Sequence, residues 1–236
     1  MLTPDIKRVA LRQCGTLGSV PIILLLLFGI ARGGDWTKEK IIYRISTGGN
    51  AEYNDLGTVV MNGRKVQLVT FRTHIGGLMD GFERIYGEPD TFLPLRIERD
   101  VLFFIRKERL IEIYSPKKSS VSIKKYVNGK FVIEYRYSKE RPVQNAILLR
   151  SYLKSAKDLH VGWSTDILIP DPYKVTLVAI EDVEVPAGKF SVYHFKSEPL
   201  KFEIWVTRDA DHVPVKLAVT GGYRTTLEMK ARIISQ

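Results

Sequence analysis

The stretch that decides the fold runs from Tyr173 to Ile234 and reads YKVTLVAIEDVEVPAGKFSVYHFKSEPLKFEIWVTRDADHVPVKLAVTGGYRTTLEMKARII. Its last segment shows the clearest pattern, because Leu227, Met229, Ala231 and Ile233 alternate with Glu228, Lys230 and Arg232. Side chains of a β-strand point to opposite faces in turn, so this period of two predicts a strand with one buried face.

Turn-forming residues divide the same stretch into five expected strands. The breaks fall at Pro186-Ala187-Gly188, at Asp209-Ala210-Asp211 and at Gly221-Gly222. Pro214 lacks a backbone N–H, so its strand is expected at an edge or bulged at that point. The fold class predicted is mainly β, a curved antiparallel meander that forms a barrel or half-barrel.

Two Asn-Gly pairs extend the meander upstream. Asn62-Gly63 and Asn128-Gly129 each lie between apolar runs, and Asn-Gly is preferred in two-residue hairpin turns. Strands are therefore expected over residues 56–61 and 64–73, and over 120–127 and 130–137. Further strands are expected over 40–47, 95–99, 101–106 and 110–114. Residues 77–94 and 159–170 look irregular, and we expect a connector over the second range.

One helix is expected between the two halves of the sheet. Arg141-Pro142 can open it, and Val143, Ile147, Leu148 and Tyr152 fall on one face. We expect this helix to pack at or across an opening of the sheet, where it serves either as a cap or as a lid over a cavity.

The N-terminus predicts export. Lys7, Arg8 and Arg12 precede an apolar run over residues 20–31, which is shorter than the ~20 apolar residues of a spanning helix. Residues 1–34 are therefore expected to be a signal peptide or a retained membrane anchor, and residues 35–236 a single β-barrel-like domain. The expected location is the periplasm or cell envelope.

Composition limits the partners. The single cysteine, Cys14, excludes an intramolecular disulfide. The formal charge of +10 is compatible with an anionic membrane surface, although scattered basic residues equally fit a solvated surface. Nucleic acid is not expected as a partner of an exported protein.

The sequence shows no catalytic motif. His74, His160, His194 and His212 are far apart and lack the spacing of metal ligands. Nucleophile elbows, phosphate-binding loops and dinucleotide fingerprints are absent from the sequence. We therefore expect no enzymatic activity, no catalytic residues, no cofactor and no metal.

The second half resembles a known family. The series Leu148-Leu149-Arg150, then VPAGKF over 185–190, IWV over 204–206, Asp209 and VPVKL over 213–217 resembles the bacterial envelope family catalogued as domain of unknown function 3108. The resemblance implies an envelope protein with a barrel-like or half-barrel sheet, similar in architecture to periplasmic lipoprotein carriers. It implies no catalytic residues.

The first hypothesis is that the concave apolar face of the sheet binds a lipid or another hydrophobic ligand. The residues expected to line it are Phe131, Ile133, Tyr135, Phe202, Ile204, Val215, Leu217, Leu227 and Met229. The alternative is that they fill a solid core and that the protein is a structural or interaction module of the envelope, binding a protein or an anionic surface. A large void would favour the first, and a filled interior with a long bare edge the second.

Overall fold

The computed structural model describes residues 38–154, 156–220 and 225–235. The chain divides into two units, 1–35 and 36–236, and the fold below is that of the second. The expected signal or anchor segment, 1–34, and the expected turn at Gly221-Gly222 lie outside the described residues. None of the helices in the described ranges has the length and apolar character needed to cross a bilayer.

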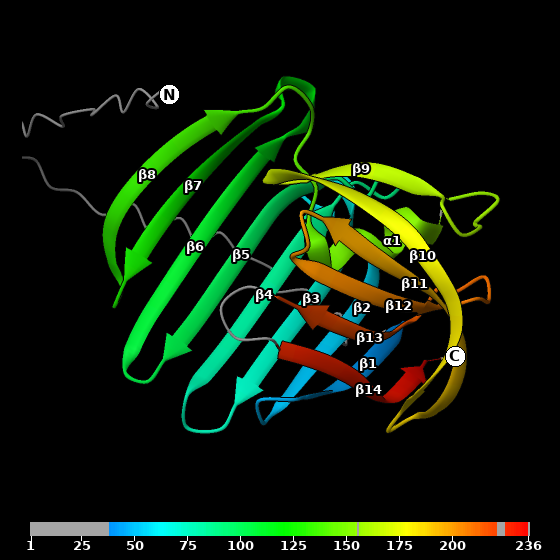
Figure 1. Cartoon of the computed structure of the whole chain (residues 1–236). Coiled ribbons are helices and arrows are strands. Elements are labelled where there is room, and N and C mark those ends of the chain that lie inside the picture. The colour runs from blue at the N-terminus through cyan, green and yellow to red at the C-terminus, as the bar shows by residue number, and fades with distance from the viewer. Residues whose placement is uncertain (1–37, 155, 221–224, 236) are drawn as a thin grey trace, which may run out of the picture. The chain divides into compact units, whose positions relative to one another are not determined.

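Fourteen antiparallel strands form one sheet in the order β8 to β1 followed by β14 to β9 (Figure 1). The first meander comprises β1 (Glu39–Ile45), β2 (Asn50–Met61), β3 (Arg64–Ile75), β4 (Met79–Gly87), β5 (Pro94–Phe103), β6 (Arg106–Ser115), β7 (Ser120–Val127) and β8 (Lys130–Ser138). The second comprises β9 (Ser164–Ile169), β10 (Asp171–Val185), β11 (Gly188–Glu198), β12 (Phe202–Thr207), β13 (Pro214–Val219) and β14 (Thr225–Ile234). Pairing of β1 with β14 joins them, and the sheet stays open between β8 and β9. The predicted mainly β half-barrel is confirmed.

Both Asn-Gly hairpins form as predicted. Asn62 and Gly63 have φ values of 52° and 75°, and Asn128 and Gly129 have values of 48° and 78°. A two-residue turn with positive φ at both positions matches the twist of the flanking strands, and Asn and Gly tolerate it best. These turns fix the registers of β2 with β3 and of β7 with β8.

Three expectations for the strands were wrong. Residues 79–87 form β4, although Gly81 and Glu83 on its apolar side hide the alternation. The three short strands expected over 95–114 are two long ones, β5 and β6, that turn at residues 104–105. The expected connector contains β9, which pairs with β10 along Ser164–Ile169. In each case pairing with a neighbouring strand outweighs the local pattern.

The helix is shorter than predicted. A 3-10 turn, η2 (Ala146–Leu148), leads into α1 (Leu149–Lys154), and a separate 3-10 turn, η1 (Pro116–Lys118), follows β6. Asn145 starts the helical segment, because its side chain accepts a hydrogen bond from the backbone N–H of Ile147 at 2.8 Å. Residues 141–145 do not open the helix as expected. The backbone N–H of Gln144 bonds instead to the carbonyl of Leu168 in β9.

Pro214 sits where its chemistry permits. The register of β12 with β13 shifts between Trp205 and Val206, and Val206 lies opposite Pro214. A bulge interrupts the hydrogen-bond ladder at Pro214, which has no backbone N–H to donate. The bulge expected from the sequence is therefore confirmed, in a strand that lies inside the sheet and not at its edge. Similar shifts occur in the pairing of β1 with β14 and of β2 with β3, and they help the sheet to curve.

The sheet curves round the helical segment (Figure 1). Leu148 packs with Ile41, Val69, Ile85 and Ile97 in one core cluster. A second cluster joins Leu149 and Leu153 of α1 to residues of β9 to β12. The inner face is therefore the face that α1 covers, and the core lies between α1 and the two meanders.

Candidate ligand-binding site

A pocket of about 220 Å³ lies beside the helical segment on the inner face of the second meander. Its apolar lining comes from six elements: Ala146 of η2, Leu149 of α1, Ile169 of β9, Tyr173 of β10, Phe202 and Ile204 of β12, and Leu217 and Val219 of β13. Phe202 lies opposite Val219, and Ile204 opposite Leu217, so these four side chains share one face. Strand alternation thus directs a continuous apolar wall toward α1.

Two aromatic rings stiffen one side of the pocket. Tyr173 and Phe202 meet edge to face with ring centroids 5.9 Å apart, an arrangement that favours a fixed ring position. Val219 is 44% exposed, so the pocket opens to solvent at the end of β13. The site can therefore admit an apolar group from outside without moving the core.

A lysine stands at the rim. Lys201 lines the pocket from the turn between β11 and β12. The hydroxyl of Ser197 accepts hydrogen bonds from the backbone N–H groups of Lys201 and Phe202, at 2.9 and 3.0 Å, and fixes this turn. The other ionised lining residue, Glu203, directs its carboxylate to His194 and Lys196, 2.9 and 3.2 Å away. Of the two ionised lining residues, Lys201 is therefore the one whose charge is not directed to these partners.

A buried ionic cluster holds α1 in place beside the pocket. The guanidinium of Arg150 binds both carboxylate oxygens of Glu39 in β1, one of them at 3.1 Å, and also bonds to the carbonyl of Asp211 at 3.2 Å. Arg232 of β14 bonds to Glu39 and to the carboxylate of Asp211, the latter at 2.6 Å. Arg150 is 4% exposed and Glu39 8%. This clamp connects α1, β1, β14 and the turn before β13.

The nine residues predicted to line the site fall into three groups. Phe202, Ile204 and Leu217 line the pocket. Val215 and Met229 are buried in the core, and Leu227 packs against it partly buried. Phe131, Ile133 and Tyr135 lie on β8 and are 57%, 43% and 45% exposed. The structure therefore brings only the first group into one site.

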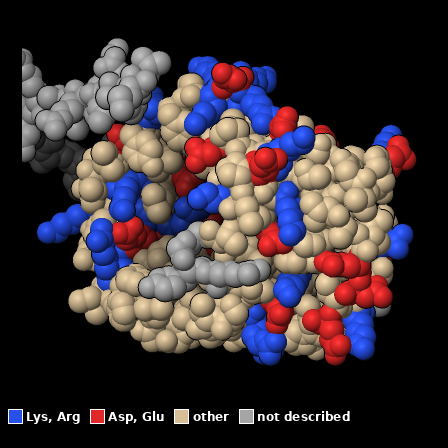
Figure 2. All heavy atoms as spheres, viewed as in Figure 1, with Lys and Arg blue, Asp and Glu red and all other residues tan. Residues whose placement is uncertain are grey.

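Ionised side chains interrupt the inner face between these groups. Across the strands, Ile97 lies opposite Glu112, Glu112 opposite Ile123, and Ile123 opposite Tyr135. Arg99 lies 3.1 Å from Glu83 and 3.4 Å from Glu112. Figure 2 shows side chains of both charges within the hollowed part of the view. The concave face is apolar near α1 and ionic farther along.

Sequence reasoning missed a second polar cluster on the opposite face. His194 bonds through Nδ1 to Glu181 and through Nε2 to Glu203, each at 2.9 Å. Its ring stacks on Trp205 at 4.2 Å, and the indole N–H of Trp205 donates to Glu181 at 2.7 Å. Both imidazole nitrogens are occupied, so the cluster fits a structural role. The residues of this cluster come from three strands, β10, β11 and β12, and only the sheet register brings them together.

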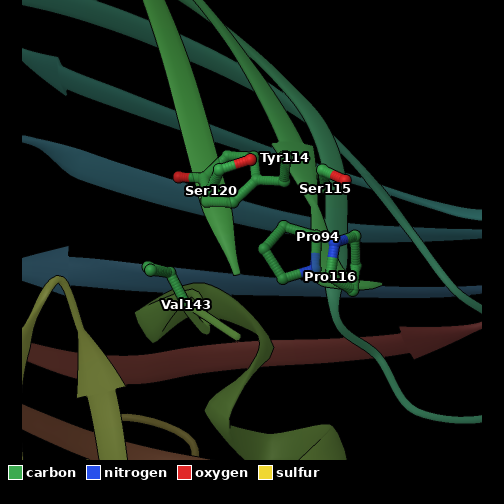
Figure 3. A pocket seen from close by; sticks show the side chains of 6 residues that line it. All are labelled: Pro94, Tyr114, Ser115, Pro116, Ser120 and Val143. Atoms are coloured by element: carbon green, nitrogen blue, oxygen red, sulfur yellow. The ribbon is translucent and has the colours of Figure 1, made fainter. Parts of the chain in front are cut away.

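A second crevice offers no room for a ligand. Pro94, Tyr114, Ser115, Pro116, Ser120 and Val143 surround it (Figure 3). It leaves no space that a water-sized sphere can enter. In the described part of the chain, no three or more His, Cys, Asp or Glu side chains are placed to hold a metal ion.

Comparison with known proteins identifies the fold and nothing finer. No protein-family model matches the chain, and no curated protein matches it. Among solved structures, a beta-barrel-like protein of domain of unknown function DUF1849 from Brucella abortus is similar, with a TM-score of 0.53 and 11% sequence identity. The match covers 85% of this chain and 98% of that one. The chain thus has a β-barrel-like fold found in a domain of unknown function, while membership of family 3108 stays a prediction.

Removing the clamp arginine should destabilise the protein. In Arg150→Ala, Glu39 loses a buried partner, and we expect the free energy of unfolding to fall by about 3 kcal/mol. Arg150→Lys should lower the free energy of unfolding by less, because a lysine keeps the positive charge but cannot form the bidentate contact with Glu39. Urea denaturation measures both. Lys189→Ala, which removes an exposed ion pair with Glu184, is the control and should change stability by less than about 0.5 kcal/mol. Equal losses in Arg150→Ala and the control would contradict the clamp.

The clamp should also make stability depend on acid pH. Burial tends to raise the pKa of Glu39, but Arg150 and Arg232 together hold it below its ordinary value. Arg232 likewise lowers the pKa of Asp211. Stabilisation from such groups is complete above their unfolded pKa values and disappears as the pH falls through the folded ones. Urea denaturation from neutral pH to about pH 3 should therefore show a shallower decline for Glu39→Gln than for the wild type. If the free energy of unfolding falls equally with pH in both proteins, protonation of Glu39 is not the cause of the decline.

Proposed function

We propose that this chain is an exported, non-enzymatic envelope protein that binds one small hydrophobic molecule, or part of one alkyl chain, in the pocket beside α1. The observation that carries the proposal is the apolar lining of that pocket together with its opening at Val219. Ligand pockets are typically apolar with a few polar groups that fix orientation. The basic and apolar N-terminal pattern supports the expected location.

The volume of the pocket restricts the ligand. An apolar cavity of roughly 150 Å³ holds a benzene molecule, and pockets for drug-sized ligands span roughly 300–1,000 Å³. A pocket of about 220 Å³ lies between these sizes. It suits a single ring or a short alkyl segment, so a two-chain lipid would insert only the end of one chain.

The charge at the rim restricts the ligand further. Lys201 is exposed and lines the pocket, whereas the carboxylate of Glu203 binds His194 and Lys196, so Lys201 is the lining residue whose charge we expect a ligand to meet. An acidic head attached to an apolar tail would satisfy both parts of the site. The ligand class that we propose is therefore a single-chain anionic amphiphile, and the net charge of +10 favours its approach from an anionic lipid surface.

Filling the pocket should abolish binding. In Val219→Trp the large ring occupies the opening without overpacking a closed core, since Val219 is 44% exposed. Isothermal titration of the full chain with octanoate should show saturable binding in the wild type and none in Val219→Trp. Val60→Trp places the same ring on β2, at a valine that is 71% exposed and outside the pocket, and should bind like the wild type. Absence of binding in the wild type, or unchanged binding in Val219→Trp, would refute the proposal.

Removing the rim charge should affect acidic ligands alone. An exposed ion pair contributes about 0.2–1 kcal/mol, so Lys201→Met should weaken octanoate binding by up to about fivefold. Binding of octanol, which has the same chain length and no charge, should not change. Octyl phosphate extends the test to a second acidic head. If Lys201→Met weakens octanol as much as octanoate, the lysine acts through pocket shape and the proposed head-group contact is wrong.

A further inference from the structure

The edge strand β8 is unusually accessible. One side of it pairs with β7 from Ser120 to Val127, and no strand in the described part of the chain pairs with its other side (Figure 1). Eight of its nine residues are exposed, and Tyr137 is the exception. A long edge with free backbone N–H and C=O groups is a template for another strand.

The opposite edge of the sheet is covered by the chain itself. The backbone N–H of Gln144 donates to the carbonyl of Leu168 at 2.8 Å, and the Gln144 side chain accepts from the Leu168 N–H at 3.1 Å. The guanidinium of Arg141 donates to the carbonyl of Asp166 at 3.1 Å. The linker between the two meanders thus occupies part of the β9 edge. The β8 edge receives no comparable cover from the described residues.

The side chains of β8 are not those of a purely charged edge. Ile133 and Tyr135 lie opposite Lys125 and Ile123, on the inner face of the sheet, and they form an apolar row that is 43% and 45% exposed. Phe131, which is 57% exposed, follows a register shift and lies on the other face, opposite Tyr126, with the two ring centroids 5.7 Å apart. Exposed apolar side chains in a continuous row commonly mark an interaction surface.

When two copies of β8 are paired antiparallel, one register places opposite charges across from each other. If two copies pair antiparallel about Tyr135, Glu134 of each copy lies opposite Arg136 of the other, and Lys130 opposite Glu140. In the same register Ile133 lies opposite Tyr137. Opposite charges placed directly across a ladder stabilise it and like charges destabilise it.

Neighbouring registers lack this complementarity. Pairing about Glu134 or about Arg136 sets two identical charges opposite each other. Pairing about Ile133 sets Lys130 opposite Arg136. A two-fold axis perpendicular to the sheet keeps the apolar rows of both copies on one face, so the register about Tyr135 satisfies charge and apolar contact together.

We propose that β8 pairs antiparallel with β8 of a second copy of this chain, in the register centred on Tyr135, and continues the sheet across a two-fold dimer. The interface lies on a strand separate from the pocket, so the dimer does not depend on ligand binding.

A charge swap tests the pairing. Glu134→Arg and Arg136→Glu each place like charges at both symmetric positions, and each should weaken the dimer by at least about tenfold. The double variant restores opposite charges and should dimerise within about threefold of the wild type. Sedimentation velocity of the full chain over a concentration series measures the dissociation constants, and circular dichroism checks that each variant is folded.

Cysteine cross-linking tests the register. In a Cys14→Ser background, which removes the chain's single native cysteine, Tyr135→Cys should form a covalent dimer on mild oxidation. Ile133→Cys should not, because the two copies of residue 133 would be roughly 13 Å apart along the strands. A wild type that stays monomeric at all concentrations would overturn the proposal. Binding of β8 to a different protein would not rescue it, because the proposed partner is a second copy of this chain. Cross-linking through Ile133→Cys but not Tyr135→Cys would overturn the register.

Discussion

The carboxylate of Glu39 holds three separate parts of the chain at one point. It lies on β1, it binds Arg232 of the adjacent strand β14, and it binds Arg150 of α1. Pairing of β1 with β14 is the junction between the two meanders, and α1 belongs to the linker that connects them through the chain. A buried carboxylate with a cationic partner on each side stabilises only this arrangement, because separating either arginine would leave a buried charge uncompensated. The position of α1, and with it one wall of the pocket, depends on this contact.

Local chemistry predicted much of the sheet, and contacts distant in sequence determined the rest. Two Asn-Gly turns and the alternation of β14 were sufficient to predict their strands. Strand β4 was missed because Gly81 and Glu83 occupy inner positions that a local pattern reads as irregular. Glu39 and Arg150 are 111 residues apart, and no periodicity relates them. From the sequence, Arg150 enters only through the family resemblance, and Asp209 through that resemblance and the turn predicted at Asp209-Ala210-Asp211. In the structure Arg150 forms the clamp, and the Asp209 carboxylate accepts from the backbone N–H of Asp211.

The candidate site was predictable in part for the same reason. Alternation predicts that Phe202, Ile204 and Leu217 lie on apolar strand faces, and in the structure these three side chains line the pocket. Alternation gives the face of a strand but not the distance round a curved sheet, so it could not show that Phe131, Ile133 and Tyr135 lie apart from the pocket. Glu112 and Arg99 stand on the inner face between them. Alternating apolar residues therefore line the pocket on the second meander, whereas on the first meander those of β8 are exposed at the edge of the sheet.

Methyl NMR tests the central claim most directly, because it locates a ligand by residue. With isoleucine, leucine and valine methyl groups labelled, octanoate should shift the resonances of Leu149, Ile204, Leu217 and Val219 in a saturable manner. The methyl groups of Val69 and Ile97, in the core of the first meander, and of Ile133 on β8 should stay unchanged. Saturable shifts confined to the pocket would support the account. Shifts centred on Ile133, or none at all, would contradict it.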